Sequence, residues 1–353
     1  MNRTDVNPDM IILARESRGL TQGELAEKCG IGQSVLSKYE NGLLAISQDQ
    51  LRPLARALGY PESLFARFEP IYGFGSSCMY HRRRQTISVN ILRRIQAQVN
   101  LKRMHIKSLL RSGIEIDVAR ELPRIDIGDY KNAEQIADLV RRTWGLPLGP
   151  IRNLISIVES AGGIVIQFSF GTNKLDAISQ WPPDMPPLFF INSDMPWERI
   201  RFSLAHEIGH LIMHKEASNN QEEEADAFAS AFLMPAREIS ADLSGITVAR
   251  AAHLKPYWKV SMQALIRRAY NLRKISESQY RRLFTEISRM GYRRHEPIDI
   301  PSEEPRVFQD LLGIHLREHR YSYSDLGRLC DLYEHEFVSS YIPRETSVIR
   351  IAK

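Results

Sequence analysis

The chain has 353 residues, of which 43% are hydrophobic and 25% are charged, an ordinary composition for a folded protein of two or three domains. Its formal net charge of +5 is compatible with a polyanionic partner without requiring one. The three cysteines are far apart, which argues against a disulfide framework and a cysteine zinc site. Because there is no run of eighteen apolar residues and no N-terminal signal sequence, we expect a cytoplasmic protein that does not enter a membrane.

The first strongly patterned segment lies in residues 1–70. Residues 20–42 are predicted to form two short helices joined by a tight turn. Thr21 and Glu24 have the spacing of a capping box, and Gly30 and Gly42 follow the two helices as terminating residues. Apolar side chains supply a shared core: Leu25, Ala26, Ile31, Val35 and Leu36. This pattern is similar to a helix-turn-helix domain of the XRE type.

The resemblance implies binding to double-stranded DNA through the second helix. Its exposed face would contact base edges, and two flanking side chains would contact phosphates; these residues are Gln33, Ser34 and Ser37 for the bases and Gln22 and Lys38 for the phosphates. Residues 1–68 carry eight basic and eight acidic side chains, however. Because affinity for a duplex comes largely from the counterions released when basic side chains neutralise phosphates, this balance of charge does not by itself predict DNA binding. The domain could instead bind protein, either the similar domain of a repressor or a second copy of itself in a homodimer.

A basic segment follows. Residues 70–114 contain no acidic residue and nine Lys or Arg residues, three of them in the cluster His81-Arg82-Arg83-Arg84. Residues 87–110 are predicted to be a helix with an apolar stripe opposite a basic outer face; the stripe contains Ile91, Leu92, Ile95, Val99 and Met104. We assign residues 71–120 to a basic linker helix, which could extend the DNA contact or hold an acidic partner.

Residues 121–300 are expected to form a domain with a small β-sheet. Helices are predicted at 131–144, 150–160, 260–270 and 276–290, and strands at 164–170, 175–181 and 188–192. We expect the last strand to be an exposed edge at which an extended substrate peptide could pair. Residues 301–353 are expected to form a helical C-terminal module. The predicted fold class is therefore mainly α with a small β-sheet (α+β).

The most specific motif is His206-Glu207-Ile208-Gly209-His210. On a helix, the two histidines lie one turn apart on the same face, so both rings can reach one Zn²⁺ ion. Glu207 would then act as the general base on water. The residues before and after the motif continue an apolar stripe, which predicts a buried helix with Ser203 as its N-cap.

A catalytic zinc site usually has three protein ligands and one open position. The next helix offers Glu222 as the third ligand, and Asp226, one turn later, can accept the N–H of a ligand histidine. Glu223 is the alternative if the register differs by one residue, and residues 222–224 could also be a solvated helix N-terminus. His214 shares the histidine face but lies roughly 12 Å from His206 along a helix, too far to be the third ligand, so we assign it either a structural role or a supporting contact to a ligand.

Taken together, residues 201–214, 224–229 and 232–235 resemble the ImmA/IrrE family of bacterial zinc peptidases. The similarity includes His81–Arg84, Trp144–Pro147 and Trp258–Ser261, and it covers roughly residues 8 to 300. It implies a zincin-like domain and a gluzincin-like metalloendopeptidase that regulates transcription by cleaving a repressor or antitoxin-like protein. A second hypothesis stays open, in which an XRE-type regulator uses the peptidase fold as a sensing or protein-binding scaffold with little hydrolysis.

Overall fold

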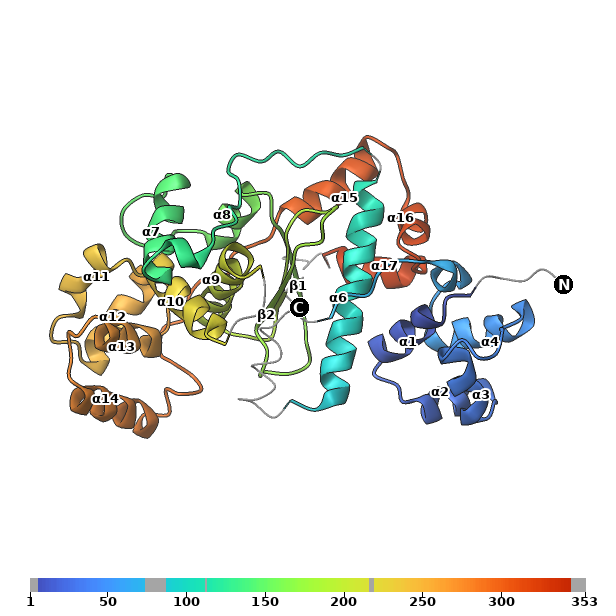
Figure 1. Cartoon of the computed structure of the whole chain (residues 1–353), viewed down its shortest axis with the longest axis horizontal. Helices are drawn as coiled ribbons and strands as arrows, with labels where there is room; N and C mark the ends of the chain where they lie inside the picture. Colours follow the sequence, from blue (N-terminus) through green and yellow to red (C-terminus); the bar gives the residue numbers. More distant parts are fainter. Residues whose placement is uncertain (1–5, 74–86, 112, 216–218, 344–353) are drawn as a thin grey trace, which may run out of the picture. The chain divides into compact units, whose positions relative to one another are not determined.

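The computed structural model describes residues 6–73, 87–111, 113–215 and 219–343 (Figure 1). The described chain is mainly helical with one small sheet, which confirms the predicted fold class. The cluster His81–Arg84 lies outside the described residues. Among the described helices, none combines the length and the apolar character needed to cross a bilayer. Two compact units are present. The helical unit contains the described residues up to 115 and those from 309 onward, and the mixed unit contains residues 116–308.

The helical unit begins with the helix-turn-helix. Its helices are α1 (Pro8–Ser17), α2 (Gln22–Cys29), α3 (Gln33–Glu40) and α4 (Gln48–Leu58), followed by the short helix η1 (Glu62–Ala66). Thr21 and Glu24 form the predicted capping box, and Gly30 ends α2 with a φ of 65° that a residue with a side chain rarely adopts. Arg15 Nε donates to Glu40 Oε1 at 2.6 Å, which ties α1 to α3.

One long helix after the helix-turn-helix and three helices near the C-terminus complete the helical unit. These are α6 (Val89–Leu110), α15 (Val307–Arg317), α16 (Tyr323–Leu329) and α17 (Glu334–Tyr341). The carboxylate of Asp331 accepts hydrogen bonds from Ser63 and Arg67, and His105 Nδ1 lies 2.6 Å from the hydroxyl of Tyr341. The predicted linker helix and C-terminal module therefore do not stand apart from the helix-turn-helix. The sequence suggested domain boundaries near residues 70, 120 and 300. Contacts between residues far apart in the sequence decide instead which elements pack into one unit.

The sheet belongs to the mixed unit. β1 (Ile164–Phe168) pairs in parallel with β3 (Leu188–Asn192), and β2 (Ala177–Gln180) pairs antiparallel with β3, which gives the order β1-β3-β2. The prediction that residues 188–192 form an edge was wrong, because β3 is the central strand. All five of its residues are buried, as expected for a strand paired on both sides. β2 is an edge strand.

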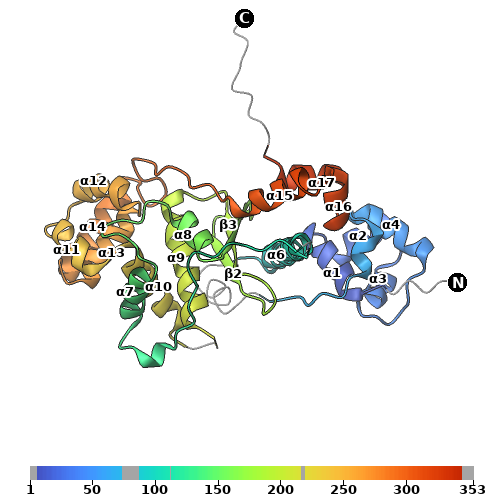
Figure 2. The same cartoon turned by 90° about the horizontal axis from the view of Figure 1, so that it is seen from above.

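The other elements of the mixed unit are helical: η2 (Ile127–Asp129), α7 (Ala133–Thr143), α8 (Leu154–Ser160), α9 (Trp197–Met213), α10 (Gln221–Leu233), α11 (Ala236–Leu243), α12 (Val248–Trp258), α13 (Met262–Asn271) and α14 (Glu277–Arg289). α9 packs against α10 and β2, whereas α11 to α14 gather at the end of the unit remote from the sheet (Figure 2). α9 begins after Pro196, not at Ser203 as predicted. Ser203 lies inside the helix and donates to Asp176 Oδ2 at 3.2 Å.

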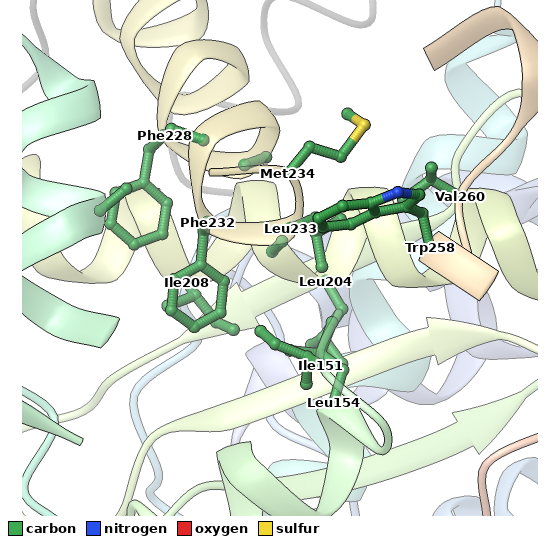
Figure 3. Close-up of a cluster of buried hydrophobic side chains, with 14 of the residues drawn as sticks. Ile151, Leu154, Leu204, Ile208, Phe228, Phe232, Leu233, Met234, Trp258 and Val260 are labelled. Carbon is green, nitrogen blue, oxygen red and sulfur yellow. The ribbon is translucent and has the colours of Figure 1, made fainter. Parts of the chain in front are cut away.

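One part of the core of the mixed unit lies between α9 and α10. Leu204 and Ile208 of α9 share one apolar cluster with Phe228 and Phe232 of α10, whose rings stack with centroids 5.4 Å apart (Figure 3). Gly209 allows this close approach, since a Cβ at that position would lie 3.0 Å from Cδ1 of Phe228. This apolar contact between α9 and α10 sets the distance and orientation at which their polar faces meet.

Candidate metal centre

α9 and α10 bring the three candidate ligands together. The Nε2 atoms of His206 and His210 lie 2.9 Å apart. Glu222, in the first turn of α10, places Oε2 3.4 Å from His206 Nε2 and Oε1 3.4 Å from His210 Nε2. Within the described residues, these three buried side chains form one cluster with the spacing that a metal ion requires.

The donor atoms are close enough together to hold one zinc ion. Atoms bound to zinc at about 2.0–2.1 Å in a tetrahedron would lie about 3.3–3.4 Å apart. Each Glu222 oxygen lies at that distance from one ring, whereas the two Nε2 atoms, 2.9 Å apart, would separate slightly around the ion. The two facing Nε2 atoms cannot both donate to each other, and Glu222 Oε1 is buried without a hydrogen bond to any described residue. Burying such an acceptor unpaired costs about 1–3 kcal/mol. A cation held by all three side chains would satisfy each of them.

Further hydrogen bonds orient the two rings. His206 Nδ1 lies 2.9 Å from Asp226 Oδ1, as the sequence predicted for an acceptor one turn after Glu222. His210 Nδ1 lies 2.9 Å from His214 Nδ1, and His214 Nε2 lies 2.9 Å from Glu224 Oε2. Contacts at Nδ1 fix the ring orientation and direct Nε2 toward the common point.

The two acids that follow Glu222 on α10 differ in what they contact. Glu223, the alternative ligand, is exposed and has no part in the cluster. Glu224 was expected to cap the helix or face solvent, but it contacts His214. The spacing of four residues between His210 and His214 could have predicted that the two rings meet on one face of α9.

The candidate base Glu207 is also buried, with 3% of its surface exposed. Ser179 Oγ donates to Glu207 Oε2 at 2.5 Å. Ser179 belongs to the edge strand β2, so this contact joins the sheet to α9. Sequence reasoning missed Ser179, because one serine in a four-residue strand carries no local pattern.

The electrostatic environment of the cluster favours a cation. Burial alone would lower the pKa of His206, but hydrogen bonds to Asp226 and Glu222 outweigh it and raise the pKa to about 10. Burial alone would raise the pKa of Glu222, but the His206 and His210 rings lower it to about 2. An environment that holds Glu222 ionised and stabilises positive charge on His206 is equally suited to a divalent metal ion.

The residues expected to contact DNA lie on α2 and α3 of the helical unit. Gln33, Ser34 and Lys38 are exposed, and Ser37 is partly buried. Gln22 is also partly buried, and its Nε2 donates to Glu40 Oε2 at 2.7 Å. α3 therefore presents three of the five candidates openly to solvent.

Comparisons with known proteins agree with these two sites. Residues 159–270 match the model of the IrrE N-terminal-like domain, a peptidase family, and this range includes the whole candidate metal centre. Residues 11–65 match a helix-turn-helix model. No curated protein matches the chain. The architecture predicted from the sequence is thus confirmed, and the chain carries an IrrE N-terminal-like peptidase domain together with an XRE-type helix-turn-helix domain.

Proposed function

We propose that this protein is a zinc-dependent, site-specific endopeptidase that acts in the cytoplasm on a protein substrate, either a transcriptional repressor or an antitoxin-like protein. The observation that carries the proposal is the convergence of His206, His210 and Glu222 beside a buried Glu207. The peptidase family of residues 159–270 supports it.

The residues around the site have distinct roles in this mechanism. Zinc, when bound, polarises the scissile carbonyl and makes water more acidic. Glu207 takes a proton from water and later delivers it to the leaving amine. The hydrogen bond from Ser179 holds one oxygen of Glu207, so the other oxygen serves the proton transfer. Asp226 and His214 keep the two ligand rings in place.

The substrate would bind as an extended peptide. β2 is an edge strand and carries Ser179, so it replaces β3 as the strand at which main-chain hydrogen bonds could form next to Glu207. The helix-turn-helix would bring the enzyme to DNA, and cleavage of a repressor would then change transcription.

Metal analysis and a cleavage assay test the proposal. Wild-type protein should contain one zinc ion per chain, and His206→Ala should lose it. Incubation with a candidate repressor should give one defined cut. Glu207→Gln should keep the zinc but abolish the cut, because it removes the base without removing a ligand.

Two results would count against the proposal. Wild-type protein that holds no zinc after reconstitution would remove the site. Zinc without cleavage of any candidate repressor, combined with binding to DNA, would favour the regulator that uses the peptidase fold as a scaffold.

A further inference from the structure

The helix-turn-helix carries no net positive charge to favour binding to DNA, and part of its basic side chains are held in ion pairs. Residues 1–68 carry equal numbers of acidic and basic side chains. Arg15 bonds to Glu40, and Arg67 pairs with Asp331. Affinity for a duplex depends strongly on the number of phosphates that basic side chains neutralise. Positive charge from another part of the chain would therefore strengthen binding.

α6 lies directly against the helix-turn-helix within the helical unit. Gln98 Nε2 donates to the carbonyl of Ser17 at 3.2 Å. Arg94 Cδ lies 3.3 Å from the position that a Cβ of Gly19 would occupy. These contacts hold the N-terminal half of α6 beside the turn between α1 and α2.

A cleft of about 540 Å³ opens between these elements. Its walls include Gln22 and Gln33 of the helix-turn-helix and Asn90 and Arg93 of α6. Gln33 is the first residue of α3 and a candidate for base contact. The first turns of α6 therefore lie next to the residues expected to meet DNA, although α6 falls outside the matched range 11–65.

Further along α6, the cations are occupied by packing and ion pairs. The Lys102 amino group lies 4.8 Å from the centre of the Tyr341 ring, and Arg103 is only 1% exposed. Lys107 and Arg111 each lie 3.1 Å from the carboxylate of Glu69. The basic outer face predicted from the sequence is thus reduced to the N-terminal turns.

Arg93 differs from these cations. Its side chain is 60% exposed, and the nearest acid, Glu16, lies 3.9 Å away. An exposed pair at this distance contributes little, about 0–1 kcal/mol, so the guanidinium can exchange it for another anion. A phosphate is a strong competitor because guanidinium can bind it through two hydrogen bonds.

We propose that the N-terminal turns of α6 extend the DNA-binding surface, with Arg93 contacting a backbone phosphate of the duplex whose bases α3 reads. Asn90, one turn before Arg93, lines the same cleft and would lie beside the same phosphate. The inference rests on the proposed DNA binding by the helix-turn-helix. Duplex DNA is favoured over an acidic protein because the cleft reaches Gln33 on the recognition helix.

The test measures how salt affects binding of the full-length protein to a labelled random duplex of about 30 base pairs, by fluorescence anisotropy at about 50–200 mM KCl. Arg93→Ala should reduce the slope of log Kobs against log salt by about 1 and weaken binding about 3- to 10-fold at 0.1 M. Arg93→Gln should behave in the same way, and Arg93→Lys should keep the wild-type slope.

Arg111→Ala is the matched control. It removes the same charge at the C-cap of the same helix, where the side chain is 62% exposed against 60% for Arg93, but about 27 Å from Arg93 along the helix axis. Its slope should equal the wild-type slope. Wild-type binding with an unchanged slope in both Arg93→Ala and Arg93→Gln would overturn this inference and leave DNA binding intact. A wild-type protein that does not bind the duplex would overturn both proposals.

Discussion

Ser179 Oγ donates a hydrogen bond of 2.5 Å to Oε2 of Glu207, which joins the edge strand β2 to the candidate general base. Glu207 is 3% exposed, so water has little access to replace this donor. The contact therefore couples the strand proposed to hold the substrate with the side chain proposed to move the proton.

Replacing Ser179 by alanine should slow cleavage without removing the metal. A hydrogen bond to a charged group contributes about 1.5–3 kcal/mol, which corresponds to about a 10- to 150-fold lower kcat. Single-turnover cleavage and zinc content, measured on the same sample, check the two effects. Ser203→Ala is the control, since that hydroxyl contacts Asp176 instead. A Ser179→Ala protein that cleaves at the wild-type rate would show that Glu207 does not depend on β2.

Asp226→Asn should weaken zinc binding while leaving the ligands in place. Asp226 accepts from Nδ1 of His206, and loss of such a partner typically costs about 10- to 100-fold in metal affinity. Glu223→Gln is the matched control, because Glu223 lies on the same helix and is exposed. Competition with a zinc chelator gives both affinities. If Glu223→Gln lowers the affinity more than Asp226→Asn does, the assigned register of α10 is wrong.

The clustering of the candidate ligands could be predicted from the sequence because much of its geometry is local. His206 and His210 share a face through helix periodicity alone, and the same periodicity relates Glu222 to Asp226 on α10. That the two helices meet at these faces depends on tertiary packing, but both helices carry clear apolar stripes that predict it.

Other features depend on contacts that no local pattern encodes. Strand order is one example: residues 188–192 form a short apolar run that suits either an edge or a centre, and the pairing with both β1 and β2 decides it. The grouping of the C-terminal helices with α6 is another, since His105 and Tyr341, which meet there, are separated by 236 residues. Ser179 was missed for the same reason.

Gly209→Ala should disturb the metal centre without altering any ligand. The added Cβ would lie 3.0 Å from Cδ1 and 3.2 Å from Cγ of Phe228, so α9 and α10 would have to move apart. Overpacking of this kind costs about 1–3 kcal/mol. The ligands are divided between the two helices, so zinc affinity should fall together with stability. Urea unfolding with and without zinc measures both.

A compensating change distinguishes the steric cause from others. Phe228→Ala removes Cδ1 and Cγ, the two ring atoms nearest to the Cβ that Gly209→Ala would add, so the double variant should recover zinc affinity relative to Gly209→Ala alone. If the double variant binds zinc no better, the close approach of these two residues does not set the ligand geometry.

The helical unit should lose stability in mild acid through His105. Burial, aided by the positive charges of Lys102 and Arg67, lowers the pKa of His105 well below its usual value. The folded unit therefore keeps the ring neutral, whereas the unfolded chain protonates it below about pH 6.5. Because the unfolded state then binds more protons, the free energy of unfolding falls as pH falls, by up to about 1.4 kcal/mol per pH unit.

Hydrogen exchange of α6 amides, followed from about pH 7.5 to 5.5, isolates this effect. Tryptophan fluorescence would not, since Trp144, Trp181, Trp197 and Trp258 all lie in the mixed unit. His105→Leu removes the contact between His105 and the Tyr341 hydroxyl and lowers stability at every pH, so the two proteins are compared by how steeply stability changes with pH. The free energy of unfolding should depend less steeply on pH in the variant. Some dependence should persist because burial also lowers the pKa of His315. An unchanged slope would mean that His105 takes up its proton in the folded unit.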